Sequence, residues 1–271
     1  MSYQFLTIER RGPVEYVTLN RPDVRNAFNE HVIADLTNWA NAAHKDSSLR
    51  VAVLAGAGKV FSAGADAAWM AKMAGYTQDE NVRDARAGAE MFLAINTVPA
   101  IVIGRIHGAA LGGGSGLAAV CDIVVADDAA IFGFTETKLG ILPAMISPYV
   151  LQKIGASAAR ELFLTGMRFD AAKAKAIGLA HQVVPLAQLD EAVAGYVAEA
   201  LTASQTAVAR SKALIPRVLG RAPADVIDIT ADAIAAQRVS PEGQEGLKAF
   251  LDKRTPSWSP SAAATGGKTP R

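Results

Sequence analysis

Apolar and polar positions along most of this chain follow two patterns, short apolar runs and longer stretches with helical spacing. Residues 3–20 alternate apolar and polar side chains on both sides of Gly12-Pro13, which predicts a β-hairpin. Apolar residues then recur at helical spacing from Val32 to Ala43, and Asn29 stands where an N-cap is expected. Between about residues 50 and 185, short β-branched runs alternate with helical patterns, which favours an α/β architecture.

The pattern changes near residue 187, after which the chain is helical in character. Helices are predicted at 187–203, 205–218, 223–238 and 241–252. The last stretch, 257–271, is rich in Ser, Pro, Ala and Gly and holds few residues that form a core, which predicts a disordered tail. We therefore expect an α/β core over residues 1–200, a helical subdomain over 201–256 and a tail over 257–271.

Composition narrows the classes of function. With 271 residues, of which 51% are hydrophobic, the chain is long enough to bury a full core in one main domain. The formal net charge is +1 and no block of Lys and Arg forms a basic tract, so the electrostatic footprint of a nucleic-acid-binding protein is missing. Cys121 is the single cysteine, which rules out an internal disulfide. The four histidines lack the spacing of a metal site.

Neither a secretion signal nor a membrane span is predicted. The start, from Met1 to Phe5, lacks the basic end and the apolar run of a signal peptide. No apolar run reaches the roughly 20 residues that a helix needs to cross a bilayer. We therefore expect a cytoplasmic protein.

Two glycine-rich stretches carry the clearest chemical signal. They are Phe61–Asp66 and Ala110–Gly116, and each follows a short apolar run typical of a strand and leads into a helical pattern. Backbone N–H groups in the first turn of a helix have no partner inside the helix, and the helix dipole adds positive charge there. Two such turns that face one point would hold a negatively charged oxygen with main-chain donors alone, which is how an oxyanion hole is built.

Glycine-rich turns also bind phosphates, so two rival motifs need to be weighed. A P-loop requires Gly-Lys followed by Ser or Thr, whereas Gly116 is followed by Leu117. A dinucleotide-binding fingerprint that begins with Gly112 and Gly114 requires its third glycine at the position of Leu117. Nucleotide hydrolysis and hydride transfer are therefore both disfavoured.

Taken together, these stretches resemble the two oxyanion loops of the crotonase (enoyl-CoA hydratase/isomerase) superfamily. The resemblance extends over nearly the whole chain, from Leu19 to Arg254. Its motifs are Arg25-Asn26-Ala27-Phe28, the Ser62–Asp66 loop, the triple glycine, Cys121-Asp122-Ile123, Glu136–Ile141 and Glu245–Phe250. It implies an α/β spiral of strand–strand–helix repeats with a C-terminal helical subdomain, a homotrimer or a dimer of trimers, an acyl-CoA thioester as substrate and no cofactor beyond coenzyme A.

The resemblance also assigns catalytic roles by matched position. It implies that the backbone N–H groups of Ala65 and Gly113 hold the thioester oxygen and that the carboxyl group of Glu136 transfers the proton. Hydratases of this superfamily usually carry a second glutamate just after the triple glycine, and that position is Gly116 here. A hydration that uses two carboxylates is therefore not expected.

Three functions stay open because of this departure. In the first, Glu136 is the only acid–base group of a hydratase, and backbone groups or the substrate position the water. In the second, the enzyme is an enoyl-CoA isomerase, since moving a double bond needs only one base. In the third, the chain binds acyl-CoA without turnover. The retention of both loops and of Glu136 argues against the third function, and among the other two we favour the hydratase.

Local signatures resemble those of bacterial methylglutaconyl-CoA hydratases, which act in the breakdown of leucine and related branched chains. The signatures are Ala67-Ala68-Trp69-Met70, Leu142–Tyr149 and Ser240–Gly246. The resemblance thus favours 3-methylglutaconyl-CoA, or a similar branched acyl-CoA, as the substrate. Its distal carboxylate would need a polar or cationic partner. Lys72, Arg83 and Tyr149 are candidates, although helix-surface or packing roles are more common for such residues.

The remaining matched positions are implied to contact CoA or the acyl chain. Trp69 follows the first loop and is expected to shape the acyl pocket. Phe250 and Lys253 match residues that reach the adenine or the phosphates, often from a neighbouring subunit. The full set expected to bind substrate or CoA is Arg25, Ala27, Ala63, Gly64, Asp66, Trp69, Gly112, Gly116, Phe250 and Lys253.

Overall fold

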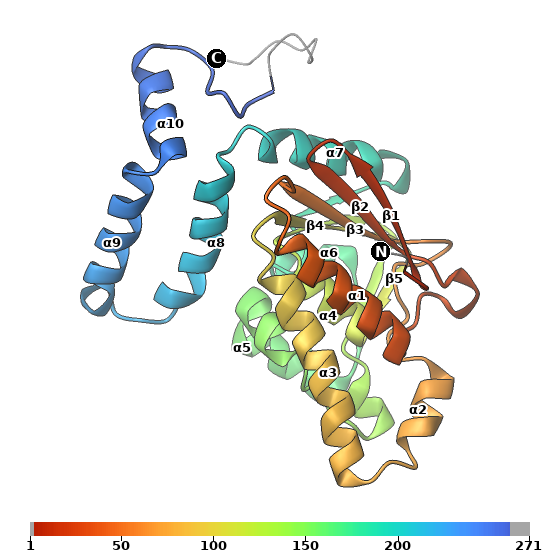
Figure 1. Ribbon diagram of the computed structural model, residues 1–271. Coiled ribbons are helices and arrows are strands. Elements are labelled where there is room, and N and C mark those ends of the chain that lie inside the picture. The colour runs from red at the N-terminus through yellow and green to blue at the C-terminus, as the bar shows by residue number, and fades with distance from the viewer. Residues whose placement is uncertain (1–2, 261–271) are drawn as a thin grey trace. The chain divides into compact units, whose positions relative to one another are not determined.

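The computed structural model describes residues 3–260, which form two compact units (Figure 1). The first unit ends at Tyr196 and the second begins at Val197, whereas the sequence predicts a boundary at residue 200. Both glycine-rich stretches and Glu136 lie in the first unit. The positions that carry the predicted chemistry therefore belong to one compact body.

A six-stranded sheet forms the base of the first unit. Its strand order is β1-β2-β3-β4-β6-β9, and within it β1 alone runs antiparallel to its neighbour. The strands are β1 Leu6–Arg11, β2 Val14–Leu19, β3 Val51–Gly56, β4 Ile101–Ile106, β6 Ile123–Asp127 and β9 Gln182–Val184. The pairing of β1 with β2 confirms the predicted hairpin. The apolar character of β3 and β4 fits parallel strands that are covered on both faces.

The chain builds a second sheet by repeating one structural unit. After β4 come β5 (Ala109–Leu111) and helix α4 (Gly113–Val120), and after β6 come β7 (Ile131–Gly133) and, further on, helix α5 (Ser147–Thr165). β4 pairs in parallel with β6, while β5 pairs in parallel with β7. Successive strand–strand–helix units therefore lie side by side, which is the arrangement expected of a spiral. β8 (Arg168–Asp170) completes the second sheet antiparallel to β7.

The preceding strand–strand–helix unit, which begins with β3, has a single β-bridge where the later units have a second strand. After β3, Ser62 makes a single parallel bridge to Ala110 of β5 in place of a full strand. Helix α2 (Ala67–Met73) then follows. The Phe61–Asp66 and Ala110–Gly116 stretches thus occupy equivalent places in successive units, and this makes them neighbours in space.

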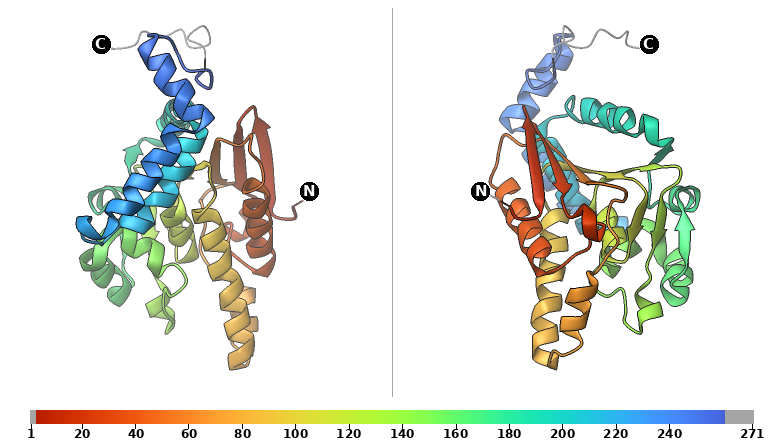
Figure 2. Two further views of the ribbon diagram at one scale, coloured as in Figure 1. Left: turned by 60° about the vertical axis from the view of Figure 1, so that its left-hand side comes forward. Right: turned by 90° about the vertical axis from the view of Figure 1, so that its right-hand side faces the viewer.

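Two long helices, α1 (Glu30–Ala43) and α3 (Gln78–Asn96), lie side by side (Figures 1 and 2). Asn29 caps α1 as predicted, because its Oδ1 accepts a hydrogen bond from Val32 N at 3.0 Å. A reciprocal capping box of Thr77 and Glu80 begins α3. The other elements of this region are α6 Ala171–Ala176, α7 Leu189–Ala200 and the 3₁₀ turns η1 Pro22–Val24, η2 Glu136–Leu139 and η3 Leu186–Gln188. The predicted helix 187–203 is therefore shorter, since its start is the turn η3.

The second unit is helical, as the pattern of its sequence predicts. It holds α8 Gln205–Val218, η4 Pro223–Val226, α9 Ile227–Arg238 and α10 Pro241–Leu251. The helix predicted at 205–218 is confirmed with the same bounds, whereas the one predicted at 223–238 begins as the 3₁₀ turn η4. None of the helices between residues 3 and 260 combines the length and the apolar character that a bilayer crossing requires.

Residues 257–260 differ from the disordered tail that was expected to begin there. Trp258 Nε1 donates to the carbonyl oxygen of Thr202 at 3.1 Å, and Ser257 N donates to Glu245 Oε1 at 3.0 Å. An indole N–H with a fixed partner anchors this segment, a signal that its composition does not carry. The rest of the expected tail, 261–271, lies outside the described residues.

Asn26 ties together the segments that lead to the first glycine-rich stretch. Its side chain is buried, its Nδ2 donates to the carbonyl oxygens of Ala57 and Val60 at 2.8 and 2.9 Å, and its Oδ1 accepts from Arg21 N at 2.9 Å. The backbone φ of 54° is left-handed, a region that Asn tolerates better than most residues. The asparagine thus meets both a hydrogen-bonding and a backbone requirement.

Asn26→Ala should lower the free energy of unfolding by about 2–4 kcal/mol, because three hydrogen bonds are lost and buried backbone groups are left unpaired. Urea denaturation measures this change. Asn38→Ala, on the exposed face of α1, is the matched control and should cause no loss, because alanine favours a helix. Equal losses in the two variants would contradict the role of Asn26.

Candidate active site

Main-chain hydrogen bonds hold the two glycine-rich stretches together. Leu111 N donates to the carbonyl oxygen of Ser62, and Ser62 N donates to that of Ala109, each at 3.0 Å. Ser62 Oγ donates to the carbonyl oxygen of Asn26 at 2.9 Å, which ties the first stretch to the turn before α1. The two loops are therefore fixed to each other as parts of one hydrogen-bonded layer.

Glycine is required where the two loops touch. Gly64 has a φ of 89°, and a Cβ added there would lie 2.7 Å from the carbonyl oxygen of Leu111. A Cβ added at Gly114 would lie 2.7 Å from the carbonyl oxygen of Ser62. Both contacts are shorter than a carbon and an oxygen can tolerate, so a side chain at either position would push the loops apart.

Two backbone N–H groups at this junction have no hydrogen-bond partner within residues 3–260. One is the N–H of Ala65, because its neighbours Gly64 and Asp66 make the paired contacts with Phe28 while Ala65 itself makes none. The other is the N–H of Gly113, the first residue of α4, which has no acceptor within the helix. Ala65 is exposed and Gly113 is half-buried, and both line one cavity. The pair has the character of an oxyanion hole.

Glu136 lies at the same junction. Gly112 N donates to the carbonyl oxygen of Gly133 at 2.8 Å, and this bond sets the path of the chain that leads from β7 into η2. A Cβ added at Gly112 would lie 3.2 Å from Glu136 Oε1, so the carboxyl group stands directly beside the second loop. Its Oε2 is buried without a hydrogen-bond partner in the described part of the chain. Burial raises the pKa of Glu136 above its usual range, so this carboxyl group holds a proton more readily than a solvated glutamate does.

One cavity of about 260 Å³ contains these groups. Its walls come from the two loops, from α2 and α3, and from the segment between Thr135 and Ile146. Seven of the predicted site residues line it, namely Ala63, Gly64, Ala65, Trp69, Gly112, Gly113 and Glu136. The remaining lining is largely apolar, including Phe28, Ile33, Met70, Met73, Met91 and Phe92. The cavity is suited to an acyl chain whose carbonyl end faces the two free N–H groups.

The other predicted site residues do not line this cavity. Arg25 is exposed, and its carbonyl oxygen accepts from Ala63 N, while Ala27 is buried and its carbonyl oxygen accepts from Arg21 Nη1. Gly116 is buried behind the second loop. Phe250 and Lys253 belong to the second unit, where Phe250 is 80% exposed and Lys253 follows α10.

Asp66 organises the first loop from behind. Its Oδ1 accepts from Ala68 N at 2.8 Å and so caps α2, and its Oδ2 forms an ion pair with Arg21 at 3.0 Å. Burial pushes the pKa of Asp66 upward, but the hydrogen bonds from Ala68 and Arg21 outweigh it, so the pKa falls below its usual value. A fixed, ionised Asp66 holds the loop and α2 in register.

Ile146 fills the space that a side chain at Gly116 would need. A Cβ added at Gly116 would overlap Cγ2 of Ile146, lie 2.9 Å from its Cβ and lie 3.3 Å from Cζ of Phe92. Ile146 itself is 2% exposed and belongs to the segment that closes the cavity. A glutamate therefore has no room at position 116, and the neighbourhood of that position is apolar.

Two functional features of the cavity were not found from the sequence. Asp84 of α3 lines the cavity, although the charged first half of that helix is typical of a solvent-exposed face. Ile146 occupies the place of a second acid, and only the tertiary packing shows this. The sequence did contain a weak indication for Asp84. A buried Trp69 needs an acceptor for its indole N–H, and Asp84 lies on the next helix along the chain.

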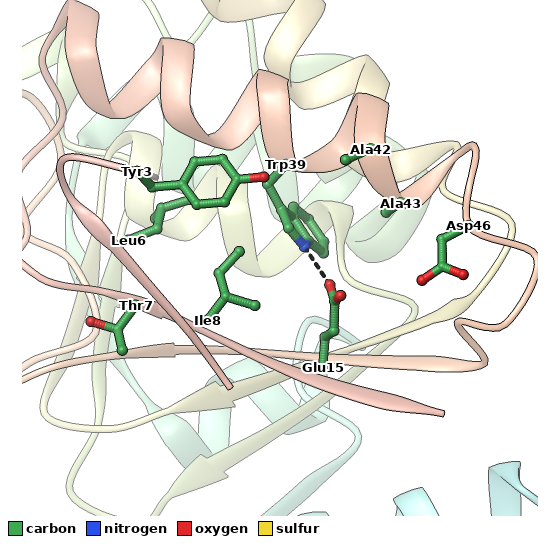
Figure 3. Close-up of a pocket in the computed structure, with 9 residues that line it drawn as sticks. All are labelled: Tyr3, Leu6, Thr7, Ile8, Glu15, Trp39, Ala42, Ala43 and Asp46. Atoms are coloured by element: carbon green, nitrogen blue, oxygen red, sulfur yellow. Dashed lines mark hydrogen bonds between the residues drawn. The ribbon is translucent and has the colours of Figure 1, made fainter. Parts of the chain in front are cut away.

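A larger hollow of about 490 Å³ lies between β1 and α1 (Figure 3). It is lined by two carboxylates, Glu15 and Asp46, and Arg10 pairs with both, at 3.0 and 2.9 Å. Glu15 also accepts from Trp39 Nε1 at 3.0 Å, as the dashed line in Figure 3 marks. Both groups that face this carboxylate are structural partners. The smaller cavity, with its unpaired carboxyl oxygen and free N–H groups, is the better candidate active site.

No group of three or more His, Cys, Asp or Glu side chains between residues 3 and 260 is placed to hold a metal ion. His107 and His181 are instead part of the hydrogen-bonded scaffold. His107 Nε2 lies 3.0 Å from the carbonyl oxygen of Gly58, and His181 Nδ1 accepts from Val124 N at 3.0 Å.

Comparison with known proteins gives a consistent result. The family model described as enoyl-CoA hydratase/isomerase matches residues 9–261. A Mycobacterium tuberculosis protein named a probable enoyl-CoA hydratase is 33% identical over 262 residues, which cover 95% of this chain and 99% of that protein. The crystal structure of an enoyl-CoA hydratase from Shewanella pealeana has a TM-score of 0.91 and 37% identity, covering 94% of this chain and 96% of that one. An enoyl-CoA hydratase/isomerase from Marinobacter aquaeolei has a TM-score of 0.89 and 39% identity, covering 94% and 99%.

Gly116→Ala should lower the free energy of unfolding by about 1–3 kcal/mol, because the added methyl group overlaps Ile146. In an Ile146→Ala background the same change should cost much less, since the methyl group enters the vacated space. Gly195→Ala, where no atom lies within 4 Å of the added Cβ, is the control and should be neutral or stabilising. Chemical denaturation of the four single and double variants measures the coupling. An equal cost in both backgrounds would show that Ile146 does not fill the site.

Glu136→Gln should make the protein more stable at neutral pH. The raised pKa means that the folded state holds this proton more tightly than the unfolded state, so Glu136 destabilises the fold increasingly as pH rises above the unfolded value of about 4.5. The stability difference between variant and wild type should therefore shrink as pH falls toward that value and stay constant below it. Denaturation curves across this range measure it. A difference that grows on acidification would contradict a buried, unpaired carboxyl group.

Proposed function

The chain belongs to the enoyl-CoA hydratase/isomerase family of enzymes, and on that basis we propose that it adds water to the double bond of a 2-enoyl-CoA thioester. The observation that carries this proposal is one cavity with two free backbone N–H groups and an unpaired carboxyl oxygen. A hydration needs hydrogen-bond donors that stabilise the negative charge on the thioester oxygen, and a group that transfers protons. The two N–H groups meet the first need and the carboxyl group meets the second. The relatives named as enoyl-CoA hydratases support the same reaction.

In the proposed reaction the thioester oxygen accepts hydrogen bonds from the N–H groups of Ala65 and Gly113. A water molecule attacks the carbon of the double bond that lies farther from the carbonyl, and the electron pair of that bond moves toward the carbonyl, so negative charge develops on the thioester oxygen. Each backbone donor typically contributes about 3–4 kcal/mol to such a transition state. Glu136 takes a proton from the attacking water and returns one to the carbon beside the carbonyl. One water is consumed, and no further cofactor is needed.

A single carboxyl group serves both proton steps in this proposal. Ile146 leaves no room for a second acid at Gly116, so the water is oriented by Glu136 and by the substrate itself. The unpaired Oε2 supports this role, because one buried oxygen is free to accept a proton from water. The raised pKa of Glu136 supports the return of that proton to carbon.

The packing of Ile146 against Gly116 also favours a second candidate, an enoyl-CoA isomerase. Shifting a double bond moves one proton between two carbons, which one base performs without water. The same oxyanion pair would stabilise the intermediate enolate. The two reactions differ in their products, since hydration adds a water and isomerisation leaves the composition unchanged.

The substrate that we propose is a branched 2-enoyl-CoA. The sequence favours 3-methylglutaconyl-CoA, whose distal carboxylate needs a partner, but none of the residues that line the cavity is Lys, Arg or His. Lys72 pairs with Glu30 at 2.7 Å, Arg83 is exposed, and Tyr149 packs near Phe92, and none of the three lines the cavity. An uncharged branched relative of that substrate therefore matches the lining better.

Further parts of the proposal rest on the resemblance of the sequence. Arg25, Ala27 and Asp66 are proposed to support the CoA-binding side of the first loop, and Phe250 and Lys253 to contact the adenine or phosphates. A homotrimer or a dimer of trimers and a cytoplasmic location are proposed on the same ground.

Glu136→Gln should reduce hydration by about 10²–10⁴-fold, because the acid–base group is lost while the cavity keeps its shape. The measurement is mass spectrometry of the products from 3-methylcrotonyl-CoA and 3-methylglutaconyl-CoA in heavy water. Wild type should add one water to 3-methylcrotonyl-CoA, the uncharged thioester, and place deuterium on the carbon beside the thioester. Glu90→Gln, an exposed position on α3 outside the cavity, is the matched control and should keep wild-type activity.

Rearrangement or exchange without a gain of mass from water would instead establish the isomerase. Turnover that survives in Glu136→Gln would contradict the role of this carboxyl group. No reaction of wild type with either thioester would contradict the proposed substrate class.

A further inference from the structure

Charge is distributed unevenly over the walls of the cavity. Among the residues that line it, the ionisable side chains are Glu136 at the oxyanion end and Asp84 on α3, and both are acidic. Asn81, the nearby amide on α3, directs its Nδ2 to the carbonyl oxygens of Tyr76 and Thr77, at 3.2 Å each. The wall around Asp84 therefore offers an acyl chain a negative charge without a compensating cation in the lining.

One oxygen of Asp84 is fixed and the other is available. Its Oδ1 accepts from Trp69 Nε1 at 3.2 Å, and Trp69 is 6% exposed. No hydrogen bond to Oδ2 occurs within residues 3–260. A buried indole thus holds the carboxylate at the wall, while its second oxygen can act only as an acceptor.

The surroundings of Asp84 raise its pKa above the usual value. Burial raises the pKa of Asp84, and the charge of Glu30 raises it further, whereas the Trp69 hydrogen bond and the charge of Lys72 lower it. Asp84 is half-buried, so solvent limits the effect of burial. Lys72 does not line the cavity, and its ammonium group forms an ion pair with Glu30, which offsets its positive charge.

We propose that Asp84 determines substrate specificity. It admits acyl chains that are uncharged and excludes those that carry a carboxylate at the end distant from the thioester. The proposal deepens the function proposed above and rests on it. A carboxylate on the acyl chain would face the carboxyl groups of Asp84 and Glu136, and like charges at this distance repel each other. A chain that ends in methyl groups meets only the apolar lining, and a hydroxyl group could donate to the free oxygen of Asp84.

The test compares the binding of two saturated thioesters that the enzyme cannot hydrate. They are 3-methylglutaryl-CoA and 3,5-dimethylhexanoyl-CoA, in which an isopropyl group replaces the carboxylate with a similar shape. Calorimetry gives the ratio of the two dissociation constants for wild type and for Asp84→Asn, which keeps an oxygen for the Trp69 hydrogen bond. Asp79→Asn is the matched control, because it removes the same charge from the same helix at an exposed position outside the cavity.

Wild type should bind the neutral thioester more tightly, and Asp84→Asn should reduce that preference by about tenfold or more. The Asp79→Asn ratio should equal that of wild type. An unchanged ratio in Asp84→Asn, or a wild type that prefers the carboxylated thioester, would overturn the proposal. Equal changes in Asp84→Asn and Asp79→Asn would also overturn it, because the effect would then be one of total charge.

Binding separates this proposal from the proposed reaction. If the ratio changes as expected but neither branched enoyl-CoA is hydrated, the role of Asp84 stands and the hydratase assignment fails. If hydration occurs and the ratio is unchanged, the hydratase stands and the role of Asp84 fails. Failure of wild type to bind either thioester would overturn both.

Discussion

The site depends on the close approach of two glycine-rich turns. Ser62 and Ala110 pair as neighbouring strand residues of successive spiral units, and Gly64 then comes so near to Leu111 that no side chain fits between them. Ala65 and Gly113, whose N–H groups have no partner within residues 3–260, both line the cavity at this contact. A small displacement of either loop would move the two N–H groups apart. They could then no longer donate to the same oxygen, which an oxyanion hole requires. The sheet thus controls chemistry through backbone geometry alone.

In the proposed mechanism, the same packing leaves the cavity with one catalytic carboxyl group. Ile146 occupies the space beside Gly116 and adds apolar surface, and Glu136 remains as an acid with one buried oxygen that has no partner. Such an unpaired oxygen destabilises a fold and is retained where it serves function. The energetic disadvantage and the proposed catalytic use of Glu136 therefore have one cause, which is its removal from water.

Local signals in the sequence predicted the parts of the fold that depend on local interactions. The hairpin, the Asn29 cap and the two glycine-rich turns all follow from residues close together in the chain. Features that need distant partners were missed. Asp84 lies in the half of α3 that is rich in charged residues, and its contact with Trp69 depends on the tertiary fold. Lys72 gave no hint that Glu30 would hold it, and Gly116 gave none that Ile146 would fill its space.

The most direct test of this account is a crystal structure of the protein with a saturated acyl-CoA such as butyryl-CoA. The account predicts that the thioester oxygen lies about 2.7–3.1 Å from the backbone nitrogens of both Ala65 and Gly113. The carboxyl group of Glu136 should face the two carbons next to the carbonyl, with the acyl chain running toward Trp69. A thioester oxygen that contacts neither nitrogen, or an acyl chain bound outside this cavity, would contradict it.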